Sequence, residues 1–86
     1  MEKEVYFLAR GRLKVEVLKL LNQPRTSTQI AKNLKKHRSA ISRIFLDLEK
    51  HGLVKCLNSE DNMSRFYQIT DKGNKIVKSY EKIMNV

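Results

Sequence analysis

The chain has 86 residues, of which 41% are hydrophobic and 7% aromatic, and it contains no tryptophan. This length supports one domain with a hydrophobic core but not two, and the few aromatic residues argue against a deep aromatic pocket for a small molecule. Eighteen Lys and Arg residues against nine Asp and Glu residues give a net charge of +9, which favours a polyanionic partner such as nucleic acid.

The positive charge is unevenly distributed along the chain. No acidic side chain lies between Glu16 and Asp47, whereas the same stretch carries seven cations: Lys19, Arg25, Lys32, Lys35, Lys36, Arg38 and Arg43. A surface that serves only solubility usually mixes both signs. We therefore expect this stretch to form a surface that meets phosphates.

No motif for catalysis can be assembled. A Ser-His-Asp set, paired carboxylates and a glycine-rich phosphate loop are all missing from the sequence, so we expect neither an enzyme nor a cofactor. The candidate soft metal ligands His37, His51 and Cys56 lack a paired Cys or His spacing, so we expect no metal site.

The cellular setting is indicated by Cys56 and by the pattern of apolar residues. Cys56 is the one cysteine, so no disulfide can form within the chain, which fits a reducing compartment. The N-terminus lacks a signal-peptide pattern, and no apolar run approaches the ~20 residues of a membrane span. We expect a cytoplasmic protein that does not bind a membrane.

The first segments in chain order are a short apolar run and a helix. Residues 4–9 fit either a strand or the first turns of a helix, and Gly11 interrupts them. Residues 12–22 have helical periodicity, and Pro24 ends this helix because the residue before a proline avoids the α region. The apolar positions of the helix are Leu13, Val17, Leu18, Leu20 and Leu21.

Two further helices follow. Thr26 and Gln29 have the spacing of a capping box, which predicts a short helix from Thr26 to near Lys35 with Ile30, Ala31 and Leu34 on its buried side. A third helix starts within two residues of Lys36 and ends at Gly52, where a left-handed residue is easiest for glycine. Its expected apolar face is Ala40, Ile41, Ile44, Phe45 and Leu48.

The last elements are a hairpin and a helix. Residues 53–57 and 65–69 are rich in β-forming residues and are joined by a polar loop, which predicts a β-hairpin. Thr70 and Asp71 suit the N-terminus of a final helix, and Gly73 suggests close packing near its start. The apolar stripe of this helix is Ile76, Val77, Tyr80, Ile83 and Met84.

Four short motifs in this order carry a family resemblance. They are residues 26–31 (TSTQIA), 40–43 (AISR), 48–54 (LEKHGLV) and 65–73 (RFYQITDKG). Together they cover about residues 12–80 and resemble the small bacterial and archaeal winged-helix regulators of the MarR and ArsR type. The resemblance implies a mainly α fold with a β-hairpin wing, in which helices are followed by a two-stranded wing and a C-terminal helix.

In such a fold the third helix enters the DNA major groove, where Arg and Ser side chains can contact base edges. Candidates for this role are Arg38, Ser39, Ser42 and Arg43. Ser27 and Thr28 at a helix N-terminus, with Lys35 and Lys36 in the following turn, are candidates for phosphate contacts. The family implies that Arg65 at the wing base reaches a phosphate or the minor groove. Because Glu60 and Asp61 place negative charge at the wing tip, we expect the wing to contact DNA through Asn62, Ser64 and Arg65.

The ends of the chain suggest a homodimer, as in the resembling families. We expect residues 1–86 to form a single winged-helix domain with a core at about 12–73, and the terminal segments 4–9 and 71–85 to pair two subunits. The candidate contact residues are Val5, Phe7, Leu8, Ile76, Tyr80, Ile83 and Met84. A two-fold dimer would present its third helices to half-sites ~34–36 Å apart.

These features favour a homodimeric transcriptional regulator that recognises a specific sequence in double-stranded DNA. Two alternatives use the same fold: a protein-interaction module in a larger assembly, and a chromatin-like protein that binds duplex DNA without sequence preference. The sequence contains no ligand-binding domain, and it identifies no small-molecule effector.

Overall fold

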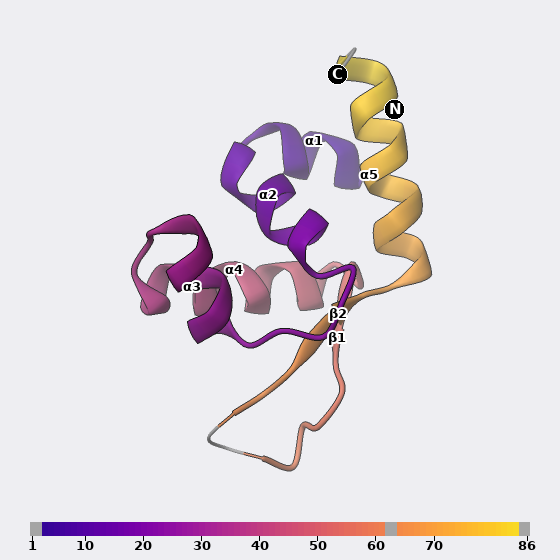
Figure 1. Ribbon diagram of the computed structural model, residues 1–86. Helices are drawn as coiled ribbons and strands as arrows, with labels where there is room; N and C mark the ends of the chain where they lie inside the picture. The colour runs from indigo at the N-terminus through magenta and orange to yellow at the C-terminus, as the bar shows by residue number, and fades with distance from the viewer. Residues whose placement is uncertain (1–2, 62–63, 85–86) are drawn as a thin grey trace.

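The structure, a computed structural model, describes residues 3–61 and 64–84 (Figure 1). The described elements are α1 (Lys3–Ala9), α2 (Arg12–Leu20), α3 (Ser27–Leu34), α4 (Arg38–Lys50), β1 (Val54–Cys56), β2 (Tyr67–Ile69) and α5 (Asp71–Met84). This order confirms the expected winged helix-turn-helix fold, with residues 54–69 as the wing. Within the described ranges, none of the helices is both long and apolar enough to cross a membrane.

The ambiguous segment at residues 4–9 forms part of helix α1. Val5 and Leu8 are three residues apart, so both face the interior, where they are only 2% and 0% exposed. Ile76 of α5 is buried in the same core. The expectation that Val5, Leu8 and Ile76 contact a second subunit is therefore wrong for these three side chains, because the folded chain itself covers them.

The helix-turn-helix segment is closed at both ends by local interactions. Thr26 Oγ1 accepts from the backbone N–H of Gln29 at 3.2 Å, and the Gln29 side chain accepts from the Thr26 N–H at 2.9 Å, which confirms the capping box. Gly52, at φ +75°, follows the end of α4 as predicted. Ile41, Phe45 and Leu48 form the buried face of α4, whereas Ala40, expected on that face, is exposed.

The wing is attached to the helices through its second strand. β1 and β2 pair antiparallel, with Val54 opposite Ile69 and Cys56 opposite Tyr67. The backbone of Arg25 pairs with the other edge of Tyr67, through N–H to O distances of 3.1 and 2.9 Å. The segment that leads into α3 is therefore fixed directly to the base of the wing.

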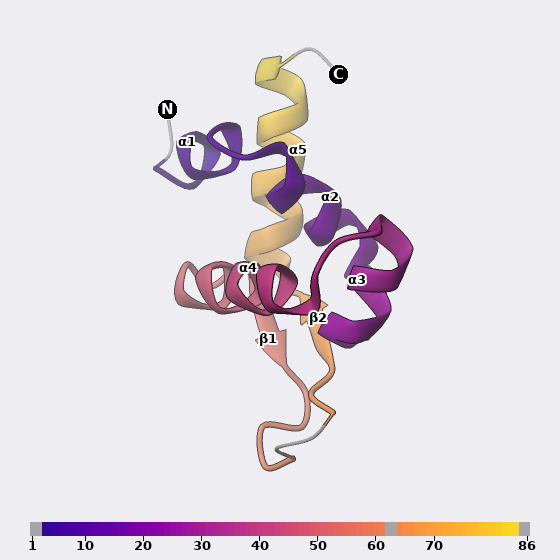
Figure 2. The same ribbon diagram turned by 90° about the vertical axis from the view of Figure 1, so that its left-hand side faces the viewer.

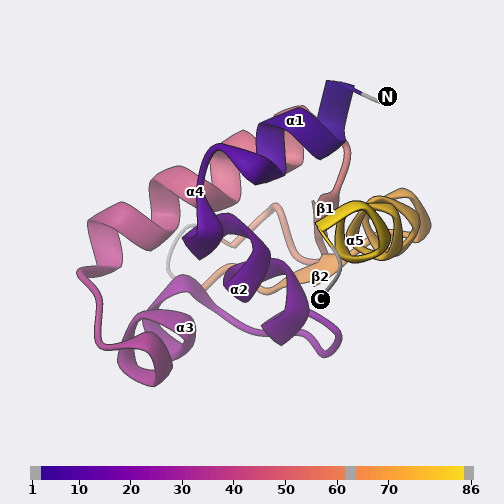
Figure 3. The same cartoon turned by 90° about the horizontal axis from the view of Figure 1, so that it is seen from above.

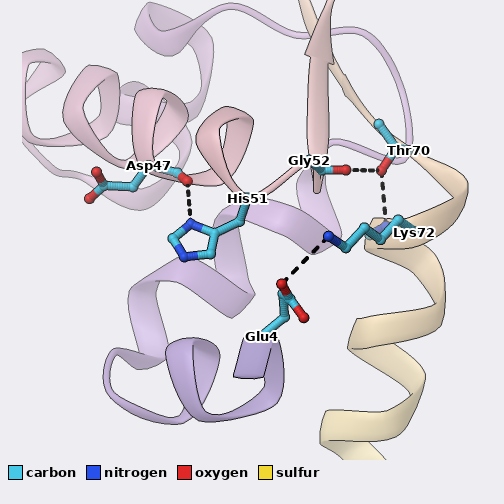
Figure 4. Close-up of polar contacts among 7 residues, drawn as sticks. Glu4, Asp47, His51, Gly52, Thr70 and Lys72 are labelled. Atoms are coloured by element: carbon cyan, nitrogen blue, oxygen red, sulfur yellow. Dashed lines mark hydrogen bonds and ion pairs between the residues drawn. The ribbon is translucent and has the colours of Figure 1, made fainter. Parts of the chain in front are cut away.

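The start of α5 packs tightly on the start of β1. Thr70 donates its hydroxyl to the Gly52 carbonyl at 2.7 Å, and its Oγ1 accepts from the Gly73 N–H at 3.0 Å, which confirms Thr70 as the N-cap (Figure 4). In the same junction, Lys72 of α5 lies 3.5 Å from the Glu4 carboxylate of α1. These contacts connect α5 to α1 and to the end of α4.

The wing and the chain termini lie at opposite ends of the molecule, which measures 37 × 25 × 18 Å (Figures 1 and 2). Seen from above, α1 runs over α4 while α5 stands end-on beside them (Figure 3). Phe7 of α1 stacks on His51 at the end of α4, with ring centroids 3.9 Å apart. The helix-turn-helix and the wing thus form one end, and the C-terminal turns of α5 form the other.

We predict that Gly73→Ala destabilises the protein by about 1–3 kcal/mol, which lowers the melting temperature by at least ~4 °C. A Cβ atom at position 73 would lie 2.2 Å from the Leu53 carbonyl oxygen and 2.6 Å from the Ile69 side chain. Thermal unfolding followed by circular dichroism measures the change. Gly11→Ala is the control, since a Cβ there meets only the Lys14 side chain at 3.7 Å. Equal stability of the two variants would contradict the close packing of α5.

Candidate nucleic-acid interface

A groove of about 670 Å³ lies between the N-terminus of α3, one side of α4 and the base of the wing. It brings together six of the predicted site residues from three separate segments: Ser27, Thr28, Arg38, Ser42, Ser64 and Arg65. Lys32 of α3, one of the cations expected to meet phosphates, also lines it, as does Leu46 of α4, which was not predicted as a site residue. The groove therefore joins residues up to 41 positions apart in the sequence, from Thr26 to Tyr67.

The floor of the groove is aromatic. Phe45 of α4 and Tyr67 of β2 line it, and their ring centroids are 4.7 Å apart. Burial, with a further contribution from the Glu49 carboxylate, raises the pKa of Tyr67, so its hydroxyl stays neutral at physiological pH. The polar rim of the groove thus rests on an uncharged, well-packed contact between the helix and the wing.

The other predicted residues of α4 and the turn lie outside the groove but on the surface. Ser39 and Arg43 are four residues apart and exposed, so they share the outer face of α4. Lys35 and Lys36 are exposed in the turn that joins α3 to α4. Asn62 lies outside the described residues.

Lys35 has an unusual backbone conformation for a lysine. Its φ of 56° and ψ of 49° are left-handed, and the Lys36 N–H bonds the Ala31 carbonyl at 2.9 Å in a Schellman-type helix end. Glycine is the preferred residue at this position, and a residue with a Cβ costs about 1 kcal/mol there. A strained non-glycine residue on a candidate binding surface is an observation that points to a functional role for the side chain.

The basic stretch between Glu16 and Asp47 is divided between two regions. Lys19 pairs with Glu81 of α5, so the expectation of a single basic surface is wrong for Lys19, and Arg25 donates its Nε–H to the Leu20 carbonyl at 2.7 Å. The other five have no ion pair within residues 3–61 and 64–84: Lys32, Lys35, Lys36, Arg38 and Arg43. All five lie on α3, α4 or the turn between them.

The amide of Asn58 and the carboxylate of Asp61 hold the wing loop in place. Asn58 accepts from the Phe66 N–H and donates to the Ser64 carbonyl, both at 2.7 Å. Asp61 accepts from the Ser64 N–H at 3.1 Å, and its carbonyl accepts from Arg65 Nε at 3.0 Å. Asp61, considered from sequence only as an unfavourable charge, is therefore a structural residue of the loop, and Asn58 was missed although asparagine after a strand often fixes a turn in this way.

No metal centre is formed by the residues that the structure describes. Within residues 3–61 and 64–84, no three His, Cys, Asp or Glu side chains come together in a way that could hold a metal ion. The chemistry of the groove is therefore that of hydroxyl, guanidinium and ammonium donors, all of which suit phosphate oxygens and base edges.

Comparison with known proteins gives one family match and several structural ones. The model of a family described as bacterial regulatory protein, arsR family, matches residues 10–55, just over half of the 86 residues. This range contains the helix-turn-helix segment and the start of the wing. No curated protein matches the sequence significantly.

Solved structures of regulators share the fold. The transcriptional regulator BldR from Sulfolobus solfataricus is 26% identical, with a TM-score of 0.75 over 87% of this chain and 55% of BldR. The multiple antibiotic resistance repressor MarR is 20% identical, with a TM-score of 0.75 over 93% of this chain and 62% of MarR. The S. aureus MepR–DNA complex is 21% identical, with a TM-score of 0.73 over 91% of this chain and 69% of MepR. The chain thus spans little more than half the length of BldR.

We predict that Lys35→Gly raises the stability by about 0.5–1 kcal/mol, because glycine removes the left-handed strain at this turn. Chemical denaturation measures the difference in the free energy of unfolding. Lys36→Gly is the matched control: it removes the same charge at a position where φ is not positive, so it should stabilise nothing. A destabilised Lys35→Gly variant would show that the strain is absent in solution.

Proposed function

The chain belongs to the arsR family of bacterial regulatory proteins, and we propose that it is a homodimeric transcriptional regulator that binds a specific sequence in double-stranded DNA. Membership of a family of regulators confirms the expectation that the chain is not an enzyme. The observation that carries the proposal is the convergence of the α3 N-terminus, α4 and the wing base on one groove that is lined by the exposed cations Lys32, Arg38 and Arg65.

The proposed recognition element is α4. The major groove of B-DNA is about 12 Å wide and admits an α-helix, and an Arg side chain can bond guanine through two parallel hydrogen bonds. We propose that Arg38, Ser39, Ser42 and Arg43 reach base edges or nearby phosphates from the exposed side of α4. MepR, which has the same fold, was solved in complex with DNA, which supports this mode of binding.

The proposed phosphate contacts surround α4. Ser27 and Thr28 offer hydroxyls and first-turn N–H groups at the N-terminus of α3, an arrangement that favours anions. Lys35 and Lys36 precede the start of α4, and the exposed residues Ser64 and Arg65 line the groove from the wing base. A DNA strand between a major and a minor groove would then be contacted from both sides.

We predict that Arg38→Ala/Arg43→Ala weakens binding to the preferred duplex by at least about 10²-fold, since each specific Arg–base contact is worth about 1–3 kcal/mol. The salt dependence of binding should also weaken. The magnitude of the slope of log K against log salt should fall by about 0.9 for each lost phosphate contact. The measurement is fluorescence anisotropy across a salt series, with a duplex selected by the wild type from a random pool.

Lys75→Ala/Lys78→Ala is the matched control, because it removes two exposed charges from α5, away from the groove. Loss of binding in this control alone, or none in the α4 variant, would contradict the proposed surface. Binding without sequence enrichment would favour the chromatin-like alternative, and no binding at ~100 mM salt would favour a protein-interaction module.

We further propose that residues 12–73 form the DNA-binding unit and that the end of α5 pairs two subunits. Ile83 and Met84 are each 48% exposed, at the end of the molecule that lies opposite the wing. Tyr80, one turn earlier, packs against the core and is half-buried. Phe7 offers less apolar surface to a second subunit than expected, because one contact is its stacking on His51 and another is the Lys14 ammonium, which lies 4.2 Å from its ring centre.

We predict that Ile83→Asp converts a dimer into a monomer in sedimentation velocity, because it places a charge in an apolar contact. The same variant should bind a full palindrome more weakly while its affinity for a single half-site is unchanged. Leu57→Asp, at a residue of similar exposure on the wing, serves as the control for the sedimentation measurement. An Ile83→Asp dimer of wild-type strength would exclude this contact.

A further inference from the structure

Leu46 is an exposed apolar side chain beside the polar and charged residues of the candidate binding surface. It lies on α4 and is 58% exposed, whereas the buried face of the same helix is formed by Ile41, Phe45 and Leu48. A single exposed leucine is common in proteins and needs no special explanation. The position of Leu46 is what matters, because it lines the same groove as Arg38, Ser42 and Arg65.

Leu46 continues a line of side chains along the helix. Arg38, Ser42 and Leu46 are spaced by four residues, so they lie on one ridge of α4. With a rise of about 1.5 Å per residue, the ridge is about 12 Å long from Arg38 to Leu46. This length corresponds to about three or four base pairs along a duplex. The ridge presents a guanidinium first, then a hydroxyl, then an apolar branched chain.

Each of these three groups has a natural counterpart in the major groove. A guanidinium suits guanine, a hydroxyl accepts or donates to several bases, and an apolar side chain suits the C5-methyl group of thymine. Leucine cannot bond a phosphate, so Leu46 differs from the cations around it in what it can recognise. We infer that Leu46 reads the methyl group of a thymine located about three or four base pairs from the base contacted by Arg38.

This inference rests on the proposed DNA binding by α4, and it adds a determinant of sequence that the hydrogen-bonding residues do not provide. Uracil pairs as thymine does and lacks only the C5-methyl group, so replacing thymine by uracil removes the contact and nothing else. Burial of one methyl group corresponds to about a three- to tenfold change in affinity. The same change should disappear when Leu46 is shortened.

The experiment uses the duplex selected by the wild-type protein, with each thymine replaced in turn by uracil. Wild type should lose about three- to tenfold in affinity at one thymine per half-site and little elsewhere. Leu46→Ala should bind the original duplex with a similar loss and should show no further loss with uracil at that position. Leu57→Ala, which shortens an exposed leucine outside the groove, should keep the uracil sensitivity of wild type.

A further variant of the duplex tests the contact by rescue. 5-Bromouracil carries a bromine of about methyl size at C5. At the sensitive position it should restore the affinity of the wild type to its value with thymine, and the affinity of Leu46→Ala should be the same as with uracil. The thermal unfolding of Leu46→Ala should match that of wild type, because the side chain is exposed.

The outcomes separate this inference from the proposed function. Sequence enrichment with no uracil-sensitive position, or with equal sensitivity in Leu46→Ala, would overturn the role of Leu46 and leave the regulator intact. If Leu46→Ala weakens binding relative to wild type by the same factor on the thymine duplex and on the uracil duplex, Leu46 contacts a deoxyribose and not the methyl group. That result would also overturn the inference. Absence of any enriched duplex would remove the proposed function itself.

Discussion

Tyr67 is the residue on which the geometry of the candidate interface depends. Its ring packs against Phe45 of α4, 4.7 Å between centroids, and its backbone pairs with Arg25 on one side and faces Cys56 on the other. One buried residue therefore holds α4, the entry to α3 and both wing strands in a fixed relation. The tyrosine is only 5% exposed, its phenol is uncharged at physiological pH, and burial raises its pKa further.

The features predicted correctly from sequence are those set by neighbouring residues. The capping box at Thr26, the left-handed Gly52 and the N-cap at Thr70 need only a few consecutive residues, and each is found where expected. Residues 4–9 could not be assigned because a run this short fits both a strand and a helix. The sequence also could not predict which terminal apolar residues are buried within the chain and which stay exposed for a second copy. Whether Val5 contacts this chain or a second copy depends on how α1 packs on α5.

The candidate interface was predicted in the same uneven way. Its cations were found from the one-sided charge of residues 17–46, but Lys19 was wrongly included because its partner, Glu81, is 62 positions away. Asn58 and Leu46 were missed because their importance follows from tertiary neighbours: the first bridges the wing loop, and the second shares a groove with residues of the wing base. Sequence patterns thus identified the elements and most of the charge, while the contacts between elements determined which side chains meet.

The most direct test of the proposed interface is to map backbone amide shifts by ¹⁵N NMR while the selected duplex is added. Binding through the groove should shift the amides of residues 27–28, 35–46 and 64–66 most strongly, in separate segments that meet only in the folded chain. Amides from the middle of α5 should change little. If the largest shifts instead cluster on α1 and α5, DNA does not bind where α3, α4 and the wing meet, and the assignment of the recognition surface is wrong.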